Sequence, residues 1–156
     1  MNKTNAMRLL DKAKISYRTV EYEVDENNLC GTHIAEESGI PLEMCFKTIV
    51  LKGERKGFCV FCLPVNKEIN LKKAAHVIGD KKIELLPVKD LQKITGYIRG
   101  GCSPVGMKKK FPTYIEHSAV KFEEISVSAG VRGLQMILSP QELISYVDAE
   151  LVDVAE

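Results

Sequence analysis

Two runs of aromatic and branched apolar residues, residues 46–51 and 58–65, flank the short polar segment GERKG. The glycine at each end of that segment lets the chain reverse direction, so the pattern predicts a β-hairpin. A hairpin pairs its strands antiparallel, whereas a doubly wound fold joins parallel strands through helices. The hairpin therefore predicts a mixed or antiparallel sheet and argues against a doubly wound one.

Helix and strand patterns alternate irregularly along the rest of the chain. Apolar spacing and capping residues predict helices at residues 4–14, 32–38, 70–77, 88–95 and 139–147. Alternating apolar residues predict strands at 17–24, 82–86, 113–115, 125–128 and 133–138, with an edge strand at 151–154. A chain of 156 residues is the size of one domain, so we expect one compact α/β domain over residues 1–156.

Charge and composition narrow the class of protein. The formal net charge of +1 provides no overall attraction to nucleic acid, so we expect no DNA binding, and tRNA would need a local basic patch. No apolar run approaches the ~20 residues of a membrane span, and the first residues lack a secretory signal pattern. Five cysteines, mostly within apolar sequence, favour reduced thiols and a cytoplasmic protein.

Residues 95–112, TGYIRGGCSPVGMKKKFP, contain four glycines, two prolines and three consecutive lysines. So much glycine and proline is unfavourable inside a helix or strand, which predicts a shaped loop. Such a loop presents backbone amides beside positive charge and suits an anionic or carbonyl-bearing ligand.

The CxxC pair Cys59 and Cys62 has a redox or a zinc interpretation. Both cysteines fall within a predicted strand, where residues three apart point to opposite faces. No second pair with metal-ligand spacing completes a zinc site, and His33, His76 and His117 are scattered. We therefore expect buried structural cysteines and no metal site.

No protein nucleophile stands out in the sequence. Cys102 and Ser103 are adjacent, but no GxSxG elbow surrounds them and Pro104 follows directly. Lys47 lies within the apolar run MCFKTIVL, where it either occupies a solvated alternate position or faces a cleft. In a cleft, its ammonium could neutralise a phosphate or polarise an ester carbonyl.

The segment VSAGVRGLQMIL contains a GxxG between two predicted strands. The GxxG clamp of KH domains joins helices, so we predict a tight turn that brings Arg132 and backbone amides near the glycine-rich loop.

Together, the segments FKTIVLKG, PVNKEINLKKAAHVIGDKKIELL, TGYIRGGCSPVGMKKKFP and VSAGVRGL have the order and spacing of the YbaK/EbsC family. That family includes the editing insertion of bacterial prolyl-tRNA synthetases. The resemblance implies an α/β (α+β) domain with a mixed, strongly curved, barrel-like sheet surrounded by helices. It also implies a trans-editing aminoacyl-tRNA deacylase that removes cysteine from mischarged proline tRNA.

The resemblance also implies roles for particular residues. Lys47 matches the lysine most closely tied to activity. The implied substrate-binding set is Tyr22, Cys30, Thr48, Tyr97, Gly100, Gly101, Ser128, Gly130, Arg132 and Gln135. Candidate tRNA contacts are Lys108, Lys109 and Lys110.

Two positions depart from the family pattern: Cys30 replaces an aromatic residue, and Gln135 replaces an aspartate. Because Cys30 is smaller than an aromatic residue, it could change which amino-acid side chain of the substrate fits in the pocket. In the cysteine-specific branch the substrate thiol attacks its own ester, so the resemblance implies neither a protein nucleophile nor a metal or organic cofactor. Its implied partners are mischarged aminoacyl-tRNA and prolyl-tRNA synthetase.

Three alternatives stay open: a deacylase for another amino acid such as alanine, a non-catalytic module that binds aminoacyl-tRNA or the synthetase, and a thiol oxidoreductase.

Overall fold

A computed structural model describes residues 2–156 of the chain. Its helices are α1 (Asn5–Lys12), α2 (Gly31–Ser38), α3 (Leu71–Ile78), α4 (Val88–Thr95) and α5 (Pro140–Val147), with short 3-10 segments η1 (Leu42–Met44) and η2 (His117–Lys121). Its strands are β1 (Tyr17–Glu21), β2 (Phe46–Gly53), β3 (Gly57–Pro64), β4 (Ile83–Leu85), β5 (Thr113–Glu116), β6 (Ile125–Ser128), β7 (Leu134–Leu138) and β8 (Glu150–Val152). Within residues 2–156, no helix is long and apolar enough to cross a membrane.

Capping side chains set the helix boundaries that the sequence predicts. The Asn70 side chain accepts a hydrogen bond from the Lys73 amide at the start of α3, and Gly79 ends that helix in the left-handed conformation. Ser139 caps α5 by accepting from the Glu142 amide, and proline follows at the first helical position.

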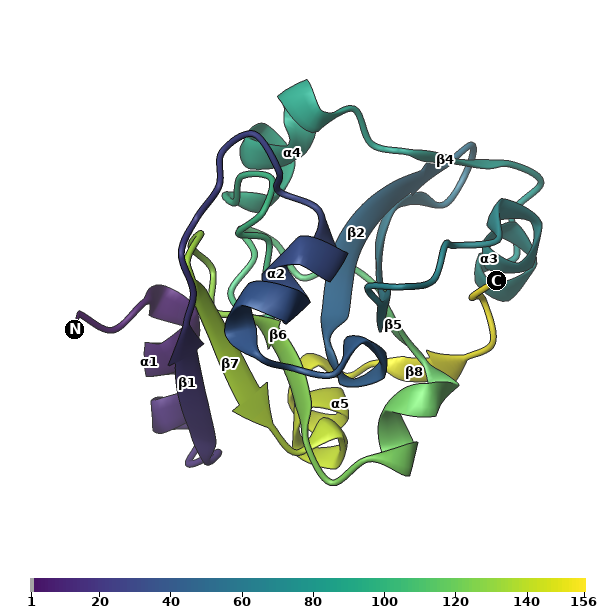
Figure 1. Cartoon of the computed structure of the whole chain (residues 1–156). Helices are drawn as coiled ribbons and strands as arrows, with labels where there is room; N and C mark the ends of the chain where they lie inside the picture. Colours follow the sequence, from purple (N-terminus) through teal and green to yellow (C-terminus); the bar gives the residue numbers. More distant parts are fainter. Residues whose placement is uncertain (1) are drawn as a thin grey trace.

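The strands form two sheets, which lie side by side in Figure 1. The smaller sheet has the order β1-β7-β6 and is antiparallel throughout. The larger sheet has the order β4-β2-β3-β5-β8, in which β3–β5 and β5–β8 are parallel and the other pairs antiparallel. The hairpin β2–β3, the mixed pairing and the edge position of β8 confirm the sequence predictions.

The structure does not support one strongly curved, barrel-like sheet. Both sheets are open, and they are joined by an isolated bridge between Cys45 and Ser126. A barrel needs a continuous ladder around its circumference. Here β6 is only four residues long, and its ladder runs to β7 and does not extend along β2.

The larger sheet is buried on both faces, as the alternation along β3 shows. Val60 and Cys62 pack into a core cluster that includes residues of α1 and α5. Cys59 and Phe61 pack into a second cluster with Ala74 of α3. This arrangement confirms that the CxxC thiols are buried and point to opposite faces.

Candidate active site

A cavity of about 310 Å³ lies where the two sheets meet. The start of β2, the start of α2, the loop after α4 and the β6–β7 hairpin all contribute to its lining. It brings together six of the predicted site residues: Cys30, Lys47, Thr48, Gly100, Ser128 and Gln135. We call it the Lys47 cavity.

Positive charge dominates the Lys47 cavity. Lys47 is half-buried near the start of β2, and its Nζ forms no ion pair or hydrogen bond with the residues that the structure describes. Arg99 lines the same cavity, and no aspartate, glutamate or histidine among the described residues does. Two cations without a counter-charge favour an anionic or strongly polarised ligand, and the lining offers neither a carboxylate nor an imidazole as general base.

Three thiols line the Lys47 cavity, in two different environments. Burial raises the pKa of Cys45 to about 11 and that of Cys102 to about 12, so both are protonated at neutral pH. Cys30 is exposed and precedes α2. A hydrogen bond with the Thr32 hydroxyl, and then one from the His33 amide, lower the pKa of the Cys30 thiol.

We expect Cys30 to be the first cysteine that iodoacetamide alkylates at neutral pH. The pKa of Cys30 lies below the ordinary thiol value of 9.0 and that of Cys45 is about 11, so the thiolate fractions differ by about 100-fold or more. Peptide mapping by mass spectrometry after brief labelling measures this order. Cys59 and Cys62, with pKa values raised to about 12 by burial, should react only after unfolding. Rapid labelling of either, or a disulfide between them, would favour the oxidoreductase alternative.

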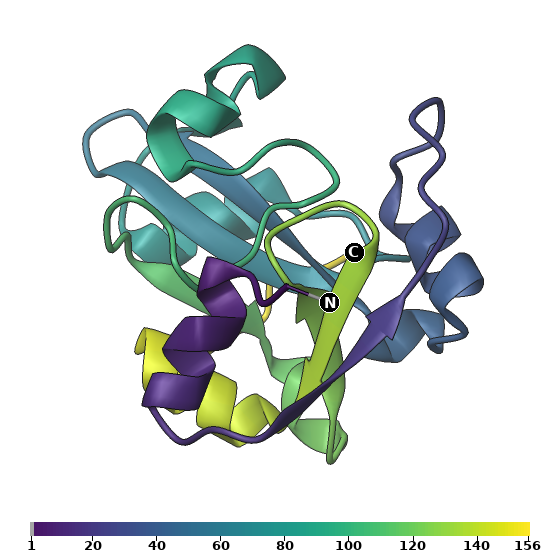
Figure 2. The same cartoon turned by 90° about the vertical axis from the view of Figure 1, so that its left-hand side faces the viewer.

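The glycine-rich loop packs directly against the β6–β7 turn, and the two segments lie side by side in Figure 2. A Cβ atom added to Gly101 would lie 3.0 Å from the backbone N of Arg132 and from the backbone carbon of Val131. The Arg132 Nε donates to the carbonyl oxygen of Arg99 over 2.9 Å. These contacts confirm that the turn brings Arg132 beside the loop, and they set the position of Gly100.

The opposite wall presents amide and hydroxyl groups. Gln135 on β7 is only 3% exposed, and its Oε1 accepts from the buried Ser126 hydroxyl over 2.8 Å. Since that bond occupies the amide oxygen, the Gln135 N–H₂ group remains for a ligand in the cavity. The Ser128 hydroxyl accepts from the Gly130 amide over 3.1 Å, which shapes the start of the turn.

Four other predicted residues line a neighbouring cavity of about 610 Å³, namely Tyr22, Tyr97, Gly130 and Arg132. Gly101 is buried between the loop and the turn and lines neither cavity. The Tyr22 hydroxyl donates to the Gly100 carbonyl over 3.5 Å, which links the two cavities. The structure thus divides the predicted set between two adjoining spaces.

The three consecutive lysines lie outside both cavities. Lys108 Nζ donates to the carbonyl of Lys93 over 3.4 Å, and Lys110 forms an ion pair with Asp148 over 3.7 Å. Lys109 and Lys110 line a separate cavity with Phe111. Part of their positive charge is therefore engaged away from Lys47.

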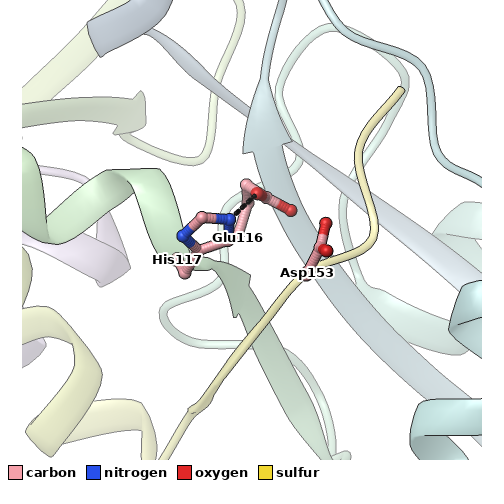
Figure 3. A group of neighbouring side chains, drawn as sticks. All are labelled: Glu116, His117 and Asp153. Atoms are coloured by element: carbon pink, nitrogen blue, oxygen red, sulfur yellow. Dashed lines mark ion pairs between the residues drawn. The ribbon is translucent and has the colours of Figure 1, made fainter.

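One group of described side chains could hold a metal ion, and the sequence pattern does not predict it. Donor atoms of Glu116, His117 and Asp153 lie within 4.8 Å of one another, and Figure 3 shows their side chains converging. The buried Glu116 carboxylate accepts from the amides of Val154 and Ala155 and pairs with His117, so it anchors the segment after β8. Asp153 is already paired with Lys73, and none of the three lines the Lys47 cavity. Asp153 is distant in sequence from Glu116 and His117, so the spacing of these residues does not predict a metal site.

This chain is similar to known proteins in its family profile, in its sequence and in its fold. The sequence profile of the aminoacyl-tRNA editing domain matches residues 32–146. EbsC of Enterococcus faecalis, named as a candidate Cys-tRNA(Pro)/Cys-tRNA(Cys) deacylase, is 44% identical over 97% of this chain and 93% of its own. A proline–tRNA ligase of Thermosipho africanus is 27% identical over 59% of this chain but only 16% of its own. In fold, a crystal structure of a candidate trans-editing enzyme for prolyl-tRNA synthetase aligns with a TM-score of 0.84 at 22% identity, over 100% of this chain and 99% of that one.

Proposed function

This chain belongs to the aminoacyl-tRNA editing domain family, and from that premise we propose that it is a trans-editing deacylase. Its substrate in this proposal is Cys-tRNA(Pro), and the reaction removes the cysteinyl group from the 3′ end of the tRNA. Residues 1–156 act as one editing domain, since strands from both ends of the chain join the two sheets.

The Lys47 cavity is the observation that carries this proposal. It combines two cations, an amide donor from Gln135 and a glycine-rich wall, and no acid or imidazole among the described residues lines it. Such a site can bind and polarise an ester, but it lacks the usual groups that activate water. A substrate that supplies its own nucleophile is suited to a cavity with this lining.

In the proposed reaction, the thiol sulfur of the bound cysteine attacks its own ester carbon. The new C–S bond forms and the C–O bond to the ribose breaks, giving a cyclic thiolactone, and the thiol proton ends on the released ribose hydroxyl. Lys47 holds the terminal adenosine or the ester in a reactive pose. The Gly100 backbone and the Gln135 amide donate to the carbonyl oxygen as negative charge develops.

The remaining substrate-binding residues complete the proposal. Thr48 and Ser128 add hydroxyl groups to the wall, and Cys30 sets the space for the amino-acid side chain. The reaction needs no metal or organic cofactor, so activity should survive a chelator. The protein acts in the cytoplasm, with prolyl-tRNA synthetase as a partner that helps to recognise the tRNA body.

A panel of charged tRNAs tests this function. Proline tRNA charged with cysteine, alanine or proline is incubated with the protein, and loss of the labelled amino acid is followed over time. We expect cysteine to be released fastest, with thiolactone detectable by mass spectrometry, because only cysteine carries the attacking thiol. Faster release of alanine would assign the other specificity, and equal release of proline would contradict an editing role.

A further inference from the structure

The larger cavity next to the Lys47 cavity has a net positive lining that the proposed chemistry does not use. Lys3, Arg8 and Arg132 line it, with Glu21 as the acidic residue among its described lining. Lys3 is paired with Asp11. Arg8 is exposed and forms no ion pair with the described residues, so two arginines outweigh one glutamate.

Two tyrosines stand beside these arginines. Tyr22 directly follows β1 and is half-buried, and its amide donates to the carbonyl of Gly133 in the turn. Tyr97 anchors its hydroxyl on the carbonyl of Val105, and a Cβ at Gly130 would lie 3.0 Å from its ring. Aromatic rings next to a positive groove are the combination that binds single-stranded nucleic acid, through base stacking and phosphate contacts.

Only a thin wall separates this cavity from the Lys47 cavity. Gly100 lines the Lys47 cavity, while its carbonyl accepts from Tyr22, which lines the other. A Cβ at Gly100 would lie 3.5 Å from the Cγ and Nε atoms of Arg132. The two cavities are therefore adjacent, which places the larger one within reach of a chain whose end enters the Lys47 cavity.

We propose that this larger cavity binds the unpaired nucleotides that precede the terminal adenosine of the tRNA. Arg8 and Arg132 contact their phosphates, and Tyr22 and Tyr97 contact their bases or riboses. At about 610 Å³ against about 310 Å³, the cavity has twice the volume of the one that receives the aminoacyl end. This inference rests on the proposed function, and it places the tRNA contact here instead of at Lys108, Lys109 and Lys110.

Arg8→Ala tests the proposal directly, because Arg8 is exposed and has no ion pair to lose among residues 2–156. Lys12→Ala is the matched control: Lys12 is exposed on the same helix, carries the same charge and lines neither cavity. Binding of a short single-stranded RNA that ends in CCA and carries no amino acid is titrated by fluorescence anisotropy at several salt concentrations. We expect Arg8→Ala to weaken binding about three- to tenfold and to reduce the slope of log K against log salt by about 0.7, the value for one phosphate contact.

A second readout compares two substrates, Cys-tRNA(Pro) and 3′-cysteinyl adenosine, which lacks the preceding nucleotides. For Arg8→Ala, the ratio of kcat/KM on the tRNA to kcat/KM on the nucleoside should fall by a similar factor, and Arg8→Lys should restore part of it. Equal effects of Arg8→Ala and Lys12→Ala on RNA binding would overturn the proposal. If the wild-type protein deacylates neither substrate, the proposed function is wrong, and the RNA titration alone still decides the role of the cavity.

Discussion

Replacing Lys47 with alanine is expected to lower kcat/KM for Cys-tRNA(Pro) by about 10²-fold, because the substrate loses the side chain that holds it in a reactive pose. Lys47 lines the cavity proposed to bind the ester, and its ammonium has no ion pair among the described residues. Its removal should therefore change the free energy of unfolding by less than about 1 kcal/mol. Deacylation kinetics and urea unfolding of the same preparation measure the two quantities.

Lys52→Ala is the matched control for this variant. Lys52 lies on the same strand but is exposed, and its Nζ lies 5.6 Å from the centre of the Phe58 ring, outside the Lys47 cavity. The control should retain the wild-type rate. An unchanged rate in Lys47→Ala, or an equal loss in both variants, would refute the assignment of Lys47.

Replacing Gly101 with alanine is expected to damage the site without touching its charges. The added Cβ would meet backbone atoms of Val131 and Arg132 at 3.0 Å, and a backbone cannot yield as a flexible side chain can. Overpacking of this kind lowers the free energy of unfolding by about 1–3 kcal/mol. Separation of the loop from the turn would also shift Gly100, and a 1 Å misplacement near the reacting atoms can cost about 10²-fold in rate.

Gly57→Ala separates lost stability from lost geometry. Gly57 has a φ of +78° at the start of β3, and no atom of residues 2–156 lies within 4 Å of the added Cβ, so alanine there is strained but meets none of them. We expect Gly57→Ala to lower stability and to leave the deacylation rate near that of the wild-type protein. Similar rates in Gly101→Ala and Gly57→Ala would show that the packing of loop against turn does not control the site.

Local signals in the sequence predict most elements of this fold. The GERKG turn, the Asn70 and Ser139 caps and the glycines after the helices each act within a few residues, so their effects are readable without the tertiary structure. Sheet closure is different, because it depends on which strands meet across the molecule. Cys45 and Ser126 form an isolated bridge between two sheets that stay open, and no local pattern encodes that outcome.

In the candidate site, too, the sequence predicts some features, whereas others depend on tertiary contacts. The motifs around Lys47, Gly100 and Gln135 mark segments that do converge on one cavity. The position of Tyr97 in the adjoining cavity depends on its hydrogen bond to Val105 and its packing on Gly130, which are tertiary contacts. The group formed by Glu116 and Asp153 depends on how the last residues return to β5.

The proposed deacylase activity is tested most directly by whether the protein speeds or slows the loss of the ester from Cys-tRNA(Pro). Cys-tRNA(Pro) is mixed with an excess of the wild-type protein, without synthetase, and the remaining ester is measured against its spontaneous loss in buffer. A deacylase speeds the loss of the ester, and we predict a single-turnover rate well above the spontaneous one. Binding of the tRNA with an unchanged or slower loss of ester would contradict the proposed deacylase activity and identify a module that shields the charged tRNA.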